Sequence, residues 1–130
     1  MADYVVYHNP DVMGYGALDV GDLSIYTNKD PGNVAGSRVW LLTGEGSPRK
    51  FLLRATFLIS EVRKSDRPEF KTRVLGKAGT LMHPMPVLND EPWFNQFKKS
   101  QGNFAFGFQP IGEPDAVAGL HALFRASTHS

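Results

Sequence analysis

The chain has 130 residues, an apolar share of 42%, a net charge of +1 and no cysteine. This length and apolar content suffice for one compact core, so we expect a single domain over residues 1–126 and a frayed tail over 127–130. The absence of cysteine excludes disulfides, thiol nucleophiles and thiolate metal sites. No apolar run approaches the roughly 18 residues that a membrane span needs, and the first residues lack the order of a secretion signal. We therefore expect a cytoplasmic protein that does not contact the membrane.

The small net charge conceals an uneven distribution along the chain. Residues 1–30 carry a balance of −4, and the remaining residues carry +5. The basic part is a candidate surface for polyanions, although a solvated face would explain each cluster taken alone. The clusters are Arg49-Lys50, Arg63-Lys64 with Arg67, the series Lys71, Arg73 and Lys77, and Lys98-Lys99.

Strand patterns dominate the first half of the chain. Residues 4–8 predict an opening strand that ends at Asn9-Pro10, residues 9–22 look irregular, and residues 23–26 form a weak strand pattern. The strongest pattern is a hairpin in which residues 38–42 and 51–62 flank the turn-rich segment 43–48. The odd positions from 51 to 59 are all apolar, which predicts that one face of this strand packs inward.

The next segment reads as irregular. Residues 63–72 are rich in charge and contain Pro68, which predicts a loop. Residues 76–80 superficially suggest a phosphate loop, but the spacing from glycine to lysine that surrounds a phosphate is missing, and a turn is the better interpretation.

Helical signals are confined to the last third. Asp90 is placed to cap a short helix in which Trp93 and Phe97 lie one turn apart, with Gly102 after its end. Residues 103–108 alternate aromatic and small side chains, which is typical of a strand. Pro114 then opens a final helix with an apolar stripe that should dock on the sheet. Together the elements predict an α/β (α+β) domain with a mostly antiparallel β core.

No catalytic constellation is evident. The four histidines are scattered, without the spacing of metal ligands, and no Gly-x-Ser-x-Gly elbow appears. His121 stands beside the apolar stripe of the final helix, which favours packing over catalysis. Asp90-Glu91 lies at a predicted helix start, where carboxylates favour the helix dipole and need no acid–base role. We predict neither enzymatic activity nor a cofactor nor a metal.

Aromatic and amide side chains near strand ends and loops remain as candidates for a binding site. An aromatic face stacks on a nucleobase for roughly 1–3 kcal/mol, and amide groups read the polar edge of the base. Core packing is the alternative: it is as good an interpretation for Trp40 on a central strand, and the better one for Trp93 on an amphipathic helix. The candidates are Tyr7, His8, Asn9, Trp40, Thr43, Trp93, Asn103 and Phe104.

The order of these motifs resembles the EVE domains of the PUA-like superfamily, which are relatives of the YTH readers of modified bases. Residues 4–10 are similar to the family's first strand and Asn-Pro turn, residues 36–44 and 54–62 to its central hairpin, and residues 107–111 to its ending. The resemblance spans most of the chain and rests on the order and spacing of the motifs. The chain departs from the family at Val12-Met13-Gly14, where a tryptophan is common, and at Gly36-Ser37, where Gly-Asp is common.

The resemblance implies a PUA-like, mostly antiparallel pseudo-barrel with a few short flanking helices. Its concave pocket would accept a flipped base, for example a methylated one. Tyr7, Asn9, Trp40 and Thr43 are assigned to this pocket by their positions in the matching motifs. Arg49, Lys50, Lys98 and Lys99 are assigned to phosphate contacts from their charge alone.

Partners follow from the same resemblance. Domains of this kind are often attached to nucleases of restriction systems that cut modified DNA, so we expect a nucleic-acid partner, DNA rather than RNA, and a fused or associated nuclease.

Two other hypotheses about function stay open. A small-molecule or protein-interaction module using the same pocket is favoured by the near-neutral net charge. A small enzyme acting on a nucleotide is disfavoured, because the sequence offers no acid–base pair.

Overall fold

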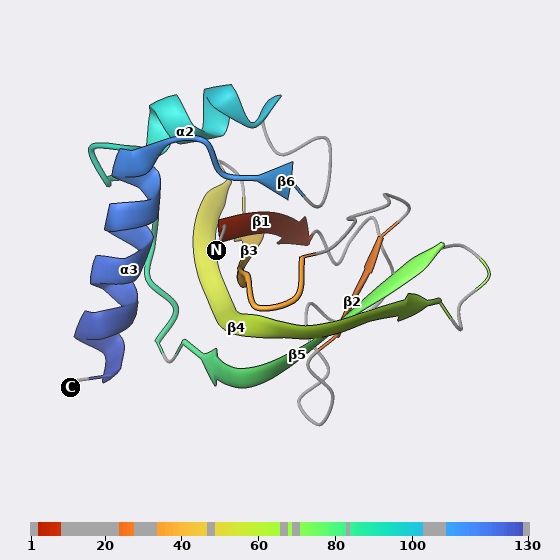
Figure 1. Ribbon diagram of the computed structural model, residues 1–130. Helices are drawn as coiled ribbons and strands as arrows, with labels where there is room; N and C mark the ends of the chain where they lie inside the picture. The colour runs from red at the N-terminus through yellow and green to blue at the C-terminus, as the bar shows by residue number, and fades with distance from the viewer. Residues whose placement is uncertain are drawn as a thin grey trace.

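The computed structural model describes residues 3–8, 24–27, 34–46, 49–65, 68, 71–82, 84–102 and 109–128. They form a six-stranded sheet and two helices, which confirms the α+β class (Figure 1). The strands are β1 (Asp3–His8), β2 (Ser24–Thr27), β3 (Arg38–Glu45), β4 (Lys50–Lys64), β5 (Thr72–Leu81) and β6 (Gln109–Pro110), and the helices are α2 (Phe94–Ser100) and α3 (Pro114–Thr128).

The sheet is strongly curved and mostly antiparallel. Its strand order is β2-β5-β4-β3-β1-β6, and β1 with β3 is the parallel pair. Figure 1 shows β4 bending through the middle of the molecule, with α3 along one side and α2 above it. Within the described residues no ladder joins the edge strands β2 and β6, so the sheet is not closed into a barrel.

The predicted central hairpin is present as β3 and β4, but β4 contains a bulge that the sequence pattern concealed. Leu42 pairs with Leu53 and Leu41 with Ala55, so Arg54 is an extra residue without a partner in β3. The bulge exchanges the two faces of the strand: Leu53 packs with Leu42 in one apolar cluster, and Ala55 packs with Leu41 in another. The prediction that the odd positions 51–59 share one face was wrong, because it assumed an unbroken alternation.

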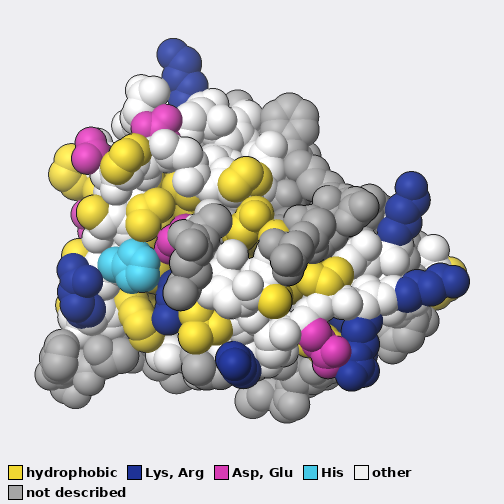
Figure 2. Space-filling model, viewed as in Figure 1, with side chains coloured by type: hydrophobic (Ala, Val, Ile, Leu, Met, Phe, Trp, Pro, Cys, Tyr) yellow, Lys and Arg dark blue, Asp and Glu magenta, His cyan; other side chains and the backbone are white. Residues whose placement is uncertain are grey.

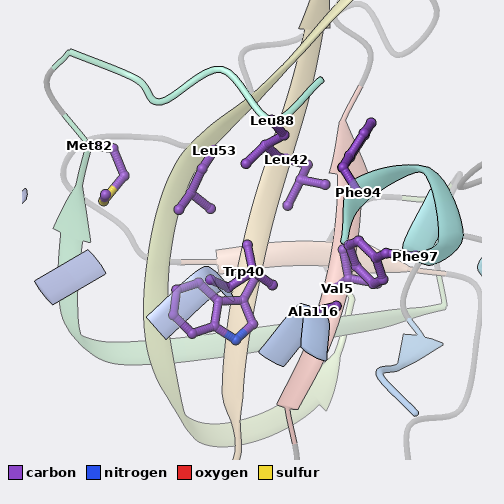
Figure 3. Packing of buried hydrophobic residues seen from close by; sticks show 10 residues of the cluster. Val5, Trp40, Leu42, Leu53, Met82, Leu88, Phe94, Phe97 and Ala116 are labelled. Atoms are coloured by element: carbon purple, nitrogen blue, oxygen red, sulfur yellow. The ribbon is translucent and has the colours of Figure 1, made fainter. Parts of the chain in front are cut away.

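Two apolar clusters therefore lie on opposite faces of the sheet. The helix-side cluster lies between the sheet and the two helices, and Figure 3 shows Trp40, Leu42 and Leu53 of the strands in one group with Phe94 and Phe97 of α2. The second, strand-side cluster packs strands against each other. Its buried members are Val6, Val34, Val39, Leu41, Ala55, Phe57, Ile59 and Val74.

Residues 76–80, predicted as a turn, lie inside β5. Gly76 pairs with Ile59, and a Cβ atom at position 76 would overlap the ring of Phe57. The small residue is there because an aromatic ring lies across it, and not because the chain turns. The loop predicted for 63–72 is correspondingly shorter, since β4 extends to Lys64 and β5 begins at Thr72.

The short helix starts later than predicted. Helix α2 begins at Phe94, with Trp93 in the N-cap position and no side-chain capping bond, so the role assigned to Asp90 was wrong. Residues before it form turns, in which the amide of Phe94 donates to the carbonyl of Glu91 at 3.0 Å. Gly102, at φ 58°, follows the helix as predicted.

The final helix begins at Pro114 as predicted and extends to Thr128, two residues into the segment expected to fray. Leu120 is completely buried in the helix-side cluster, which confirms that the apolar stripe docks on the sheet. The strand predicted for residues 103–108 lies outside the described residues. Neither helix in the described part of the chain is long and apolar enough to cross a membrane.

Candidate nucleic-acid interface

The end of β1, the turn from β3 to β4 and the start of α2 lie close together. The parallel pairing of β1 with β3 sets Tyr7 beside Leu42, and the antiparallel hairpin sets Gly44 opposite Phe51. Three predicted candidates, Tyr7, Arg49 and Lys98, lie together at this place. We call this place the hairpin end and define it by Tyr7, Gly44, Arg49, Phe51, Asn89, Phe94 and Lys98.

An aromatic group forms the centre of the hairpin end. The ring centroid of Phe51 lies 5.6 Å from that of Tyr7 and 5.3 Å from that of Phe94. The ammonium group of Lys98 lies 5.0 Å from the same Phe51 centroid, within cation–π range. Phe94 is buried, whereas Tyr7 and Phe51 are partly exposed. The pair Tyr7–Phe51 therefore offers aromatic surface next to a cation.

Arg49 is held against this aromatic group. Its Nη1 atom donates a hydrogen bond of 3.0 Å to the hydroxyl oxygen of Tyr7. A Cβ atom at Gly44 would overlap that hydroxyl and would lie 2.9 Å from Cδ of Arg49. The contact between Tyr7 and Arg49 thus depends on glycine at position 44.

The side chain of Asn89 fixes the start of β4. Its Oδ1 accepts a 2.7 Å hydrogen bond from the amide of Phe51, and its Nδ2 donates a 3.1 Å bond to the carbonyl of Arg49. The amide of Leu88 also donates to the carbonyl of Phe51 at 2.8 Å. On the side of β4 away from β3 these bonds take the place of a neighbouring strand, so the chain that precedes α2 helps to set the positions of Arg49 and Phe51.

The cations of the hairpin end are available to an external anion. Within the described residues the ion pairs are Arg63–Glu61 and His121–Asp3, so neither Arg49 nor Lys98 is bound to a carboxylate there. Lys50 and Lys99 are exposed. Lys50 lies opposite Glu45 in the hairpin register. In the view of Figure 2 the Lys and Arg side chains are spread around the periphery and do not form one continuous patch.

Trp40, for which core packing and a pocket wall were equally good interpretations, belongs to the core. Its exposed fraction is 0%. Its ring lies 4.8 Å from that of His121 and 6.2 Å from that of Phe124, both in edge contacts, and its Nε1 donates a 2.7 Å hydrogen bond to Oδ2 of Asp3. Helix α3 covers this part of the sheet, so Trp40 does not line an open pocket.

The other predicted base-pocket residues are dispersed or lie outside the description. Thr43 is buried on β3. Trp93, at the start of α2, packs its indole against Gly119 of α3, where a Cβ atom would overlap the ring. Asn9, Asn103 and Phe104 lie outside the described residues, as does the side chain of His8.

Sequence reasoning missed four residues of the hairpin end, which are Gly44, Phe51, Asn89 and the buried Phe94. Phe51 was assigned to an inward face with residues that the bulge places on the other side of the sheet. Gly44 counted only as a turn former, and Asn89 carried no signal, because both of its partners lie some 40 residues away along the chain.

A second polar group, also missed, lies where α3 meets the start of β1. Nε2 of His121 lies 3.1 Å from Oδ2 of Asp3, with side-chain exposures of 34% and 19%. The guanidinium of Arg38 lies over Phe124, 5.1 Å from its centroid. Figure 2 shows the histidine beside an acidic side chain. Among the described residues no hydroxyl hydrogen-bonds His121.

The described residues contain no group of three or more side chains able to hold a metal ion. In comparisons with known proteins, no family model, no curated protein and no solved structure matches the chain. The resemblance to EVE domains therefore stays a prediction, and the case for function rests on the geometry of the hairpin end.

Proposed function

We propose that the chain is a non-catalytic nucleic-acid-binding module that holds nucleic acid at its hairpin end. The observation that supports this most directly is the placement of Arg49 and Lys98, from separate elements, around the partly exposed pair Tyr7–Phe51. Cations beside aromatic faces are the combination that binds phosphate and stacks on bases.

The two cations suit different parts of this task. The Arg49 guanidinium is planar and carries five N–H donors, of which one on Nη1 is used by Tyr7. The others can form a fork on a phosphate, and the bond to Tyr7 limits the freedom that would be lost on binding. Lys98 supplies a point charge near Phe51. Lys50 and Lys99, both exposed, would add contacts that are mainly electrostatic.

In its finer form, the proposal is an EVE-type reader of a modified base in DNA, flipped out of the duplex. It requires the curved sheet to be completed into a PUA-like pseudo-barrel by segments outside the described residues. With Trp40 and Thr43 buried, the base pocket would be formed by Tyr7 together with His8, Asn9, Asn103 and Phe104. Such a reader would work in the cytoplasm as the specificity domain of a modification-dependent nuclease.

Binding of labelled oligonucleotides, measured by fluorescence anisotropy over a salt series, tests the proposal. The arms are single- and double-stranded DNA, with and without methylated cytosine or adenine, and RNA of the same sequence. We expect affinity to fall as salt rises, which gives a negative slope of log K against log salt. The variants Arg49→Ala and Lys98→Ala should each make this slope less steep by about one. Lys77→Ala, which removes an exposed cation from β5, is the matched control and should leave the slope unchanged.

An oligonucleotide affinity that does not change with salt concentration would contradict the proposal. Undiminished affinity in the Arg49→Ala/Lys98→Ala double variant would also contradict it.

The spread of cations in Figure 2 and the near-neutral net charge favour one other candidate, a module that binds a small uncharged ligand on the Tyr7–Phe51 pair. Saturable binding of a free nucleoside without binding of any oligonucleotide would support that candidate instead.

A further inference from the structure

Arg54 occupies an unusual place on β4. It is the extra residue of the bulge between Leu53 and Ala55. Bulges commonly turn a side chain out of the regular alternation, and they are frequent beside functional sites. At about 3.3 Å per residue, Arg54 lies roughly 16 Å along the strand from Arg49, so it does not belong to the hairpin end.

The bulge coincides with a change in the neighbour of β4. Strand β5 pairs with Ala55 through its last residue, Leu81. Beyond that point residues 82 and 84–88 lie beside β4. The amide of Met82 donates to the carbonyl of Arg54 at 2.9 Å, and the amide of Leu53 donates to the carbonyl of Pro86 at 3.0 Å. Arg54 therefore lies where one backbone neighbour replaces another.

The guanidinium of Arg54 is poorly satisfied in this position. Its Nε atom is shielded from solvent and has no hydrogen-bond partner. Its Nη1 atom has the thioether sulfur of Met85 at 4.0 Å, and sulfur is a weak acceptor. No carboxylate among the described residues forms an ion pair with Arg54. A partly buried arginine without an oxygen acceptor is uncommon, because a shielded cation needs an anion or hydrogen bonds to offset its lost hydration.

The acidic residue of β4 does not serve Arg54. Glu61 lies seven residues further along the strand and is bound to Arg63 at 2.8 Å. An anion for Arg54 would therefore come from outside this strand. Arginine is the side chain whose fork geometry fits a phosphate best.

We propose that Arg54 is the anchor of a second phosphate-binding site, at the bulge of β4. In the free protein the guanidinium rests against Met85, and on binding the unbranched, partly exposed Met85 side chain moves aside so that the fork reaches the phosphate oxygens. The phosphate belongs either to a nucleic-acid backbone or to a free phosphate monoester. The first source rests on the function proposed above, and the second is independent of it.

Nuclear magnetic resonance of the ¹⁵N-labelled chain tests this inference directly. The Nε–H resonance of Arg54 is the one missing from the spectrum of Arg54→Met. We expect it to shift saturably when inorganic phosphate is added at constant ionic strength against chloride, and to shift again with a short oligonucleotide. Arg54→Met should fold with unchanged or slightly higher stability, since it replaces an unsatisfied cation by an apolar chain of similar length. Arg63→Met, which removes an exposed cation from the same strand, is the matched control.

The outcomes separate the two proposals. A shift with the oligonucleotide alone assigns the phosphate to nucleic acid, and a shift with both ligands includes free phosphate. Absence of a saturable shift with either ligand would overturn the inference, as would a marked loss of stability in Arg54→Met. Equal oligonucleotide affinity in Arg54→Met and the natural chain would exclude nucleic acid as the source of the phosphate at Arg54 and leave the hairpin end intact. A saturable shift with inorganic phosphate, in a protein that binds no oligonucleotide, would leave the Arg54 site intact and overturn the function proposed for the hairpin end.

Discussion

The indole nitrogen of Trp40 donates a 2.7 Å hydrogen bond to Oδ2 of Asp3, a residue 37 positions away. The same oxygen lies 3.1 Å from Nε2 of His121. One carboxylate oxygen of Asp3 thus connects β1, β3 and α3. It also accepts the hydrogen bond of the indole N–H, which is the only polar group of the completely buried Trp40 side chain.

Replacing Asp3 by alanine should therefore destabilise the protein. The buried N–H of Trp40 would lose its acceptor, at a cost of about 1–3 kcal/mol in the free energy of unfolding measured with urea. Asp3→Asn keeps an oxygen acceptor and should restore most of this loss. Asp90→Ala removes an exposed carboxylate that does not cap α2, and should change stability by less than about 0.5 kcal/mol. Equal stability of Asp3→Ala and the natural chain would mean that the Asp3–Trp40 bond contributes nothing.

Truncation of Trp40 distinguishes a core residue from a pocket wall. Because the side chain is fully buried in the helix-side cluster, Trp40→Ala should cost about 3–5 kcal/mol or prevent folding. Trp40→Phe should be milder and should leave oligonucleotide binding unchanged. Circular dichroism during urea unfolding measures the first effect and anisotropy the second. Loss of binding at undiminished stability in Trp40→Phe would restore the pocket role that burial argues against.

Gly119 of α3 offers a test in which packing and helix propensity oppose each other. Glycine to alanine in a helix normally stabilises by about 1 kcal/mol. Here a Cβ atom would overlap the indole of Trp93, so Gly119→Ala should lower stability or, at best, gain nothing. Thermal unfolding of Gly119→Ala, Trp93→Leu and the double variant measures the coupling. We expect the double variant to be more stable than the sum of the single changes predicts.

Gly76 of β5 should be equally intolerant of a side chain. A Cβ atom there would overlap the ring of Phe57, which is completely buried, so Gly76→Ala should cost about 1–3 kcal/mol in urea unfolding. Gly112→Ala is the matched control, because nothing lies within 4 Å of a Cβ atom at that position. If both variants lost the same stability, the cause would be the backbone and not the contact with Phe57.

Local sequence patterns were sufficient where neighbouring residues decide the structure. The β-branched and aromatic run of residues 4–8, the turn formers between β3 and β4, and Pro114 at the start of α3 predicted elements that the structure contains. In the site, charge alone selected Arg49 and Lys98, and the end of the first strand selected Tyr7. These residues do meet at the hairpin end.

Contacts between distant segments decided the rest. The bulge at Arg54 depends on how β4 pairs with β3, and it reverses the faces of the strand, so no alternation rule applied to one strand can reveal it. Gly76 resembles a turn residue until the ring of Phe57 is placed on it. The sequence by itself thus determined the first strand, the central hairpin, the final helix and the identity of the cations. Only tertiary packing decided which faces of the strands pack together and that Trp40 lies in the core. The burial of a residue depends on which distant segments of the chain pack against it.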